Sequence, residues 1–239
     1  MPLLRPHPEA QPRPRSVWLR ENISESHRSQ LTDSLRRITG WSNLAFDANG
    51  ALQTGETQPE GGSQSARLLL EKAISGRRII IVEDASNRSD VAFASVVPGR
   101  WLRKVADKPE AYVVRIDFED FNNLIGDKPA REAFNAGWAA LHEIEHAVND
   151  SADPAQFNEL GDCETRINVM RRELNLPERA GYFHTVLPVS GDSHNFPTTF
   201  VRLAFETRAD AQQKKRYWLM WDAAIVGGST TSATLAAVK

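Results

Sequence analysis

Apolar side chains recur at helical spacing in four stretches of the chain. The pattern predicts helices over residues 24–38 and 63–75, each ended by a glycine, and over residues 153–174. The fourth stretch surrounds residues 141–148, LHEIEHAV, where apolar side chains occupy one flank and polar side chains the other. Each pattern is typical of a helix that buries one face and leaves the other for solvent or chemistry.

Runs of β-branched and aromatic residues predict strands between and after these helices. They lie at residues 78–83, 91–97, 111–118, 181–190, 198–207 and 215–223. Asn49-Gly50 predicts a hairpin with a two-residue turn within residues 43–54. The strand at 111–118 shortly precedes the helix at 141–148. If it lies at the edge of a sheet above that helix, its backbone can pair with an extended peptide.

This order of elements predicts an α+β fold in which a small, mostly antiparallel sheet packs on two helices, those containing residues 141–148 and 153–174. We expect residues 1–20 to form a mobile tail, because its first 15 positions contain five prolines with arginines between them. Residues 21–226 are expected to form a single domain. Residues 227–239, rich in Ser, Thr and Ala, are expected to be a frayed C-terminal tail.

Composition narrows the function classes. A hydrophobic fraction of 41% in 239 residues supports a substantial core, and a net charge of −2 argues against nucleic-acid binding. Cys163 is the single cysteine, so no disulfide can form within the chain. The sequence contains no apolar run typical of a signal peptide or a membrane span. We therefore expect no membrane association, and a cytoplasmic protein or one exported without a cleaved signal peptide.

His142, Glu143 and His146 form the motif H-E-x-x-H. At about 100° per residue, the two histidines lie one turn apart on the same helix face, where both imidazoles can reach one metal ion. Zinc suits this donor set, and a catalytic zinc keeps one coordination position for water. Glu143 is rotated away from that face, but it can reach the water and act as general base. We expect one zinc ion per chain.

A third protein ligand must complete the zinc shell. Glu164 is favoured, because it lies at the margin of the apolar stripe of its predicted helix, next to Cys163. Asp162 and Glu159 are alternatives. Further candidates for this ligand are Asp150 and Asp153, in the loop after His146, and His184 and His194 farther along the chain.

Further residues are candidates for supporting roles. Asn168 and Arg171 share a helix flank with Glu164 and are expected to buttress it. A peptidase also needs a donor that stabilises the oxyanion of the tetrahedral intermediate. The candidates are Tyr182, His184 and His194, which follow the predicted helix and can fold back over the metal.

The segment LHEIEHAV, together with GDCETRINVMRRELNLPERAGY, resembles bacterial HExxH zinc metallopeptidases whose third ligand is a glutamate. It is most similar to the compact gluzincin-like group that includes type III secreted effectors and the peptidase ends of polymorphic toxins. These commonly carry the pattern N-x-x-R-x-E-x-G-L-P-x-R-x-x-Y, matched here by Asn168, Arg171, Glu173, Leu176, Pro177, Arg179 and Tyr182, with Asn175 in place of the glycine. Ile167 stands where the group commonly has an acidic residue. The resemblance covers about residues 112–182.

The resemblance implies a zincin-like fold and zinc-dependent hydrolysis of peptide bonds in a protein or peptide substrate. It also makes an effector or toxin role conceivable. Two other functions are compatible with the same residues. One is a binding module that keeps the peptidase scaffold without catalysis, and the other is a zinc hydrolase of a non-peptide amide. The sequence carries no signal for the oligomeric state.

Overall fold

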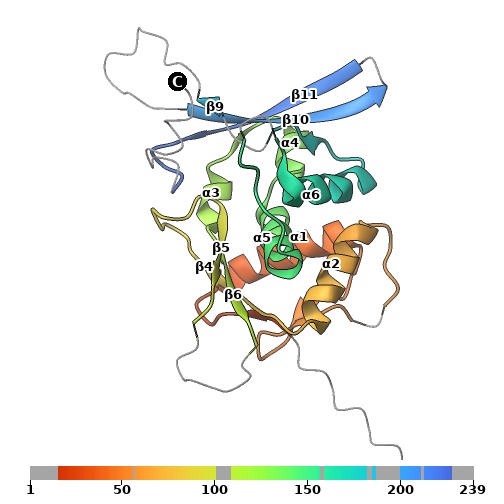
Figure 1. Cartoon of the computed structure of the whole chain (residues 1–239), viewed down its shortest axis with the longest axis vertical. Helices are drawn as coiled ribbons and strands as arrows, with labels where there is room; N and C mark the ends of the chain where they lie inside the picture. The colour runs from red at the N-terminus through yellow and green to blue at the C-terminus, as the bar shows by residue number, and fades with distance from the viewer. Residues whose placement is uncertain are drawn as a thin grey trace, which may run out of the picture.

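The computed structural model describes residues 16–55, 57–100, 109–156, 159–181, 185–186, 200–210 and 213–227. They form a mixed α and β structure (Figure 1). The helices are α1 (Glu25–Thr39), α2 (Gln64–Ser75), α3 (Phe118–Asn122), α4 (Lys128–Glu132), α5 (Ala136–Asn149) and α6 (Gly161–Glu173). The strands are β1 (Val17–Leu19), β2 (Ala45–Phe46), β3 (Leu52–Gln53), β4 (Ile79–Asp84), β5 (Ala94–Pro98), β6 (Ala111–Ile116), β7 (Ile125–Gly126), β8 (Glu178–Arg179), β9 (Thr185–Val186), β10 (Phe200–Asp210) and β11 (Gln213–Asp222).

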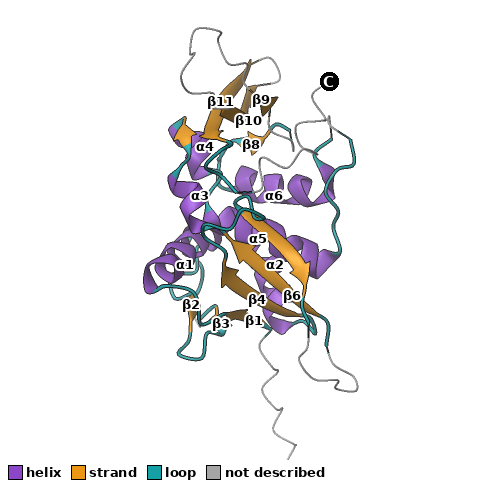
Figure 2. Cartoon of the chain, turned by 90° about the vertical axis from the view of Figure 1, so that its left-hand side faces the viewer, coloured by secondary structure: helices purple, strands orange, loops and turns teal. Residues whose placement is uncertain are grey.

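The first sheet has the strand order β1-β4-β6-β5 and packs on α5 through β5 and β6 (Figure 2). Two of its three pairings, β1 with β4 and β4 with β6, are parallel. It therefore differs from the mostly antiparallel sheet that the sequence predicts. Parallel neighbours need a long return connection, and the segment that contains α1 and α2 provides one between β1 and β4.

Strand β6 lies inside this sheet, between β4 and β5. The hypothesis that residues 111–118 form the edge strand is therefore wrong. The edge beside α5 is β5, which runs antiparallel to β6. The period of apolar residues identifies a strand, but the order of strands depends on pairings between distant parts of the chain.

The second sheet has the order β7-β11-β10-β8, with β9 also paired to β10, and is antiparallel throughout. Its hairpin pairs Phe200 with Asp222 at one end and Asp210 with Gln213 at the other, close to the predicted strands at 198–207 and 215–223. The sheet lies at the top of Figure 1 and contacts α4 through β11 and α6 through β8. One face buries Val201, Leu203, Phe205, Leu219 and Trp221.

Helix α5 is at the centre of the larger hydrophobic cluster. Asn135 caps its first turn by accepting the N–H groups of Gly137 and Trp138. A side chain at Gly137 would meet the Ser34 hydroxyl at 2.3 Å, so glycine allows α1 to approach closely. Leu141 and Ile144 are buried on the core-facing flank, as the helical pattern predicts. This packing leaves the histidine-bearing flank of α5 for the site.

Two predicted boundaries need correction. Val17–Leu19 is strand β1 and Val17 is buried, so the predicted tail of residues 1–20 extends too far into the domain. Residues 1–15 and 228–239 lie outside the described ranges. The helix predicted over 153–174 begins only at Gly161, whose left-handed φ of 73° breaks the helix. The loop before it packs buried Pro154 against Gly161.

Other predicted elements form where expected. Helix α1 has Ser24 as its N-cap and ends at Gly40 in the left-handed conformation. The hairpin β2–β3 also forms, but its turn is longer than two residues, because the Asp47 carboxylate accepts the N–H groups of Asn49 and Ala51. Within the described ranges, no helix has both the length and the apolar character that crossing a bilayer requires.

Candidate metal centre

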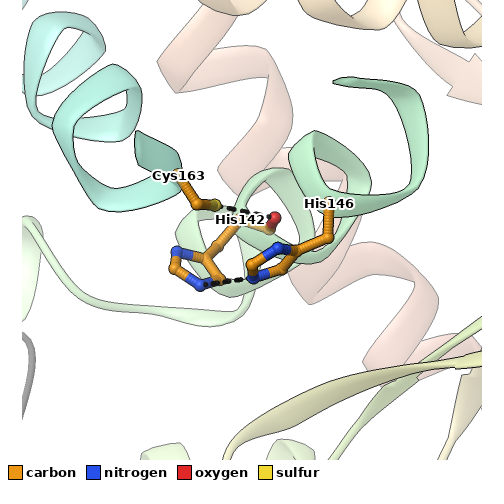
Figure 3. Close-up of side chains that lie close together, drawn as sticks. All are labelled: His142, His146 and Cys163. Carbon is orange, nitrogen blue, oxygen red and sulfur yellow. Dashed lines mark hydrogen bonds between the residues drawn. The ribbon is translucent and has the colours of Figure 1, made fainter. Parts of the chain in front are cut away.

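Helix α5 directs His142 and His146 toward the same point (Figure 3). Their Nε2 atoms are 3.1 Å apart, and the two rings are nearly perpendicular at 77°. Both side chains are largely buried, with 12% and 14% of their surface exposed. The i and i+4 spacing therefore brings the two imidazoles together as the sequence predicts.

A third donor atom completes the arrangement, and it belongs to Asp153. Its Oδ1 lies 3.3 Å from Nε2 of His142 and 3.2 Å from Nε2 of His146. We call these three atoms the donor triangle. A tetrahedral zinc shell with bonds of about 2.0–2.1 Å places neighbouring donors about 3.3 Å apart. The donor triangle therefore has the dimensions of one face of a zinc shell.

The chain reverses after α5 to bring Asp153 back to the histidines. Asp150 caps the helix in the left-handed conformation, with a φ of 52°, and its N–H donates to the His146 carbonyl oxygen. Arg78, next to β4, fixes this end of α5 by donating to the Asp150 carboxylate at 2.8 Å and to the Ala147 carbonyl at 2.9 Å. The Asp150 turn thus determines where Asp153 lies.

The outer ring nitrogens have acceptors of their own. His146 Nδ1 lies 2.6 Å from the Ser151 carbonyl oxygen, and His142 Nδ1 lies 3.3 Å from Oε2 of Glu164. An acceptor at Nδ1 favours the tautomer that carries its proton there and leaves Nε2 as the donor toward a metal. Both imidazoles are therefore oriented with Nε2 toward the donor triangle.

Glu164 does not occupy the predicted ligand position. It lies at the opposite nitrogen of His142, is 1% exposed, and is paired with Arg171 and, at 3.0 Å, with Arg179. Burial acts to raise the pKa of Glu164, but the two guanidinium groups outweigh it and hold the pKa well below its usual range. Glu164 therefore orients His142, with its charge neutralised by arginine.

Of the two residues expected to buttress this carboxylate, Arg171 contacts it directly and Asn168 contacts only the arginines around it. Arg171 donates to Glu164 and, at 2.8 Å, to the Asn168 side-chain oxygen. Asn168 in turn exchanges hydrogen bonds with the backbone of Arg179, at 2.8 and 2.9 Å. Asn168 therefore supports Glu164 through the two arginines, and Arg171 supports it directly.

Cys163 is the second candidate for a third donor. Its buried Sγ, on α6, and the histidine nitrogens all lie within 4.8 Å of one another. Figure 3 shows the sulfur directed at the backbone of His142, where the thiol donates to the carbonyl oxygen at 3.4 Å. The Asp153 oxygen lies within 3.3 Å of both Nε2 atoms, whereas the Cys163 thiol is bonded to the His142 carbonyl oxygen, so we favour Asp153 over Cys163.

The charges around the histidines favour a cation. Burial acts to lower the pKa of His142, but hydrogen bonds with Asp153, Cys163 and Glu164 raise it well above its usual value. For His146, burial is likewise outweighed by Asp153 and Cys163, and the pKa rises to about 10. The same negative surroundings would favour a metal ion at the donor triangle.

Glu143 is half-buried beside the histidines and faces β5. Burial raises its pKa, and the two imidazoles oppose that rise. The backbone N–H of Val96, in the edge strand, lies close enough to the Glu143 carboxylate to oppose the rise in its pKa. Together with His142, Glu143 lines a cavity of about 130 Å³ at the entry to β5.

The remaining predicted residues lie elsewhere. Asp162 and Glu159 are exposed and, among the described residues, form no ion pair. Tyr182, His184 and His194 fall outside the described residues. Sequence reasoning considered Asp153 but did not choose it. The available signal was the end of the polar flank of α5 at Asn149-Asp150, which predicts a turn that can return Asp153 to the helix.

Comparisons of this chain with protein-family models, with curated proteins and with solved structures find no match.

Proposed function

We propose that the chain is a zinc-dependent peptidase with a zincin-like arrangement, in which His142, His146 and Asp153 hold one zinc ion. The observation that carries the proposal is the donor triangle, with edges of 3.1 to 3.3 Å, beside the Glu143 carboxylate. The H-E-x-x-H resemblance supports the same chemistry. Asp153 replaces Glu164 as the proposed third ligand.

The donor set fits zinc, because two neutral imidazoles and one carboxylate leave a fourth position for water. When bound there, zinc would acidify this water and polarise the carbonyl group of the scissile bond. Glu143 accepts a proton from the water, whose oxygen bonds to the carbonyl carbon. Glu143 then passes the proton to the leaving amine as the C–N bond breaks. The raised pKa of Glu143 suits both transfers.

The edge of β5 is the proposed docking line for the peptide. Because β5 is the edge strand and its Ala94 lines the same cavity as Glu143, the open side of this strand lies next to the proposed general base. An extended peptide can add to such an edge through backbone hydrogen bonds. In this proposal β5, and not residues 111–118, is the strand that pairs with the peptide substrate.

The substitution Glu143→Gln tests the proposal. We expect kcat/KM on a proteome-derived peptide library to fall by about 10²–10⁴-fold, while one zinc per chain is retained. Metal content is measured on protein purified without chelator, and cleavage by mass spectrometry. Glu132→Gln, an exposed carboxylate on α4, is the control and should retain full activity.

Two results would contradict the peptidase. Full activity of the Glu143→Gln protein would remove the general base from the mechanism. Zinc-loaded wild-type protein that cleaves no peptide would favour hydrolysis of a non-peptide amide, to be sought by substrate screening. If the purified protein binds no zinc, a non-catalytic binding module that keeps the peptidase scaffold would be the better description of its function.

A further inference from the structure

The cavity beside Glu143 has an aromatic and apolar wall. Phe93, Ala94, Phe134, Trp138 and Ala139 contribute to it, from the entry to β5 and from the start of α5. Its volume of about 130 Å³ is below that of pockets for drug-sized ligands and leaves room for a single side chain. A peptide lying along β5 would therefore place a side chain near this cavity.

Two carboxylates, Glu143 and Glu164, and two guanidinium groups, Arg171 and Arg179, line the cavity, so their formal charges balance. Glu164 lies between Arg171 and Arg179, as described above. The same guanidinium groups lie over the rings of Trp138, at 5.2 Å, and Phe134, at 6.0 Å. A charged side chain entering here would lose its hydration without gaining an unneutralised partner. An apolar side chain has no such hydration to lose, so we expect the cavity to favour apolar residues.

Phe93 has an unusual conformation in this wall. Its φ of 63° lies in the left-handed region, which bulky residues rarely adopt. Two contacts from the α3 segment hold it there. Its N–H donates to the Asp120 carboxylate at 2.9 Å, and its carbonyl accepts the Asp117 N–H at 2.9 Å. Backbone strain of this kind concentrates at functional sites, where the surroundings enforce it.

The Phe93 ring is also fixed on its outer side. It lies 5.1 Å from the Phe134 ring, 5.0 Å from the Trp221 ring and 5.3 Å from the Phe121 ring. Only 7% of the residue is exposed. Because both the backbone and the ring are held, Phe93 is a rigid boundary of the cavity.

We propose that Phe93 determines the substrate specificity of this site, by limiting the size of the apolar side chain accepted next to the scissile bond. Asp120 is the positioning residue that holds it there. The inference rests on the proposed peptidase function and adds to it a substrate class: peptides with an apolar residue beside the cleaved bond.

The test compares wild-type protein with Phe93→Gly on an equimolar library of random peptides. Glycine removes the ring and adopts positive φ without strain, so the backbone can keep its path. For each protein we compare kcat/KM for peptides with tryptophan beside the cleaved bond with kcat/KM for peptides with valine there. We expect this ratio to be about tenfold or more higher in Phe93→Gly than in wild type. Phe46→Leu is the matched control, since it removes a buried ring that neither lines the cavity nor belongs to the Phe93 cluster. Its ratio should stay within about twofold of wild type.

Asp120 is tested by rescue. Asp120→Ala should change the preference in the same direction as Phe93→Gly, whereas Asp120→Asn, which retains an oxygen acceptor, should restore the wild-type profile with unchanged zinc content. An active wild-type protein whose preference is unaltered by Phe93→Gly would overturn the inference and leave the peptidase intact. A shift of equal size in Phe46→Leu would also overturn it. Failure of zinc-loaded wild-type protein to cleave any library peptide would remove the peptidase function and the inference with it.

Discussion

Two carboxylates approach His142, one at each ring nitrogen, and their surroundings differ sharply. Asp153 lies on the loop after α5, has 43% of its side chain exposed, and faces Nε2. Glu164 lies on α6, has 1% of its side chain exposed, and faces Nδ1 from between two arginines. The comparison shows that a carboxylate beside a histidine can serve either the metal or the scaffold, according to what neutralises it.

The largest expected effect is on stability, in Glu164→Gln. The change leaves Arg171 and Arg179 without their shared anion in a buried site, and removing one partner of a buried pair costs about 3–5 kcal/mol. Urea unfolding of the metal-free protein measures it. Glu178→Gln breaks the more exposed pair with Arg172 and should cost at most about 1 kcal/mol. If Glu164→Gln loses no more unfolding free energy than Glu178→Gln does, then Glu164 does not stabilise the scaffold.

Asp153→Ala should act on the metal instead. Zinc affinity is expected to fall by about a hundredfold or more, beyond the usual effect of a group that only orients a ligand. This corresponds to about 3 kcal/mol, with little change in the stability of the metal-free protein. Competition with a chelator measures the affinity, and Glu159→Ala is the control on an exposed acid nearby. If zinc binds Asp153→Ala as tightly as wild type, Asp153 is not a ligand.

Asp120 extends the comparison to a carboxylate that is buried and, among the described residues, has no ion pair. Burial is the main cause that raises its pKa from 3.8 to about 6, so the folded state binds this proton more tightly. Between pH 4 and 6 the unfolded chain ionises first, and stability falls as the pH rises, by at most about 3 kcal/mol. Glu164, with its lowered pKa, contributes in the opposite sense and loses its contribution on acidification.

The measurement is the free energy of unfolding at several pH values in wild-type and Asp120→Asn protein. The difference between the two should change across pH 4 to 6 and be constant above pH 7. A constant difference over the whole range would mean that Asp120 does not titrate as its burial implies.

The smallest effect is expected for Cys163→Ala. If Asp153 is the third ligand, zinc affinity should stay within about threefold of wild type, and the loss of a buried thiol should cost about 1 kcal/mol. The same chelator competition measures it. A fall in affinity as large as that of Asp153→Ala would assign the third position to Cys163 instead.

The sequence predicts local features of this molecule well. The H-E-x-x-H spacing places His142 and His146 together because helix geometry alone sets their distance, and Ser24 and Gly40 bound α1 because capping is local. The position of β6 inside its sheet depends on β5, a segment whose pairing no local pattern encodes. Likewise, the flank of Glu164 correctly directs it toward α5, but its charge is neutralised by Arg171 and by Arg179 of β8. The choice between Glu164 and Asp153 therefore required tertiary contacts.

The Asp150 turn has a consequence for how a metal ion would bind and be released. The turn is fixed to the first sheet by a partly exposed contact between Asp150 and Arg78, whereas the histidines stand on a helix whose far flank is in the core. A small hinge rotation at the turn would withdraw Asp153 and open the donor triangle without unpacking α5. Ion exchange in this protein would then be a surface event, limited by the movement of a short loop and independent of unfolding.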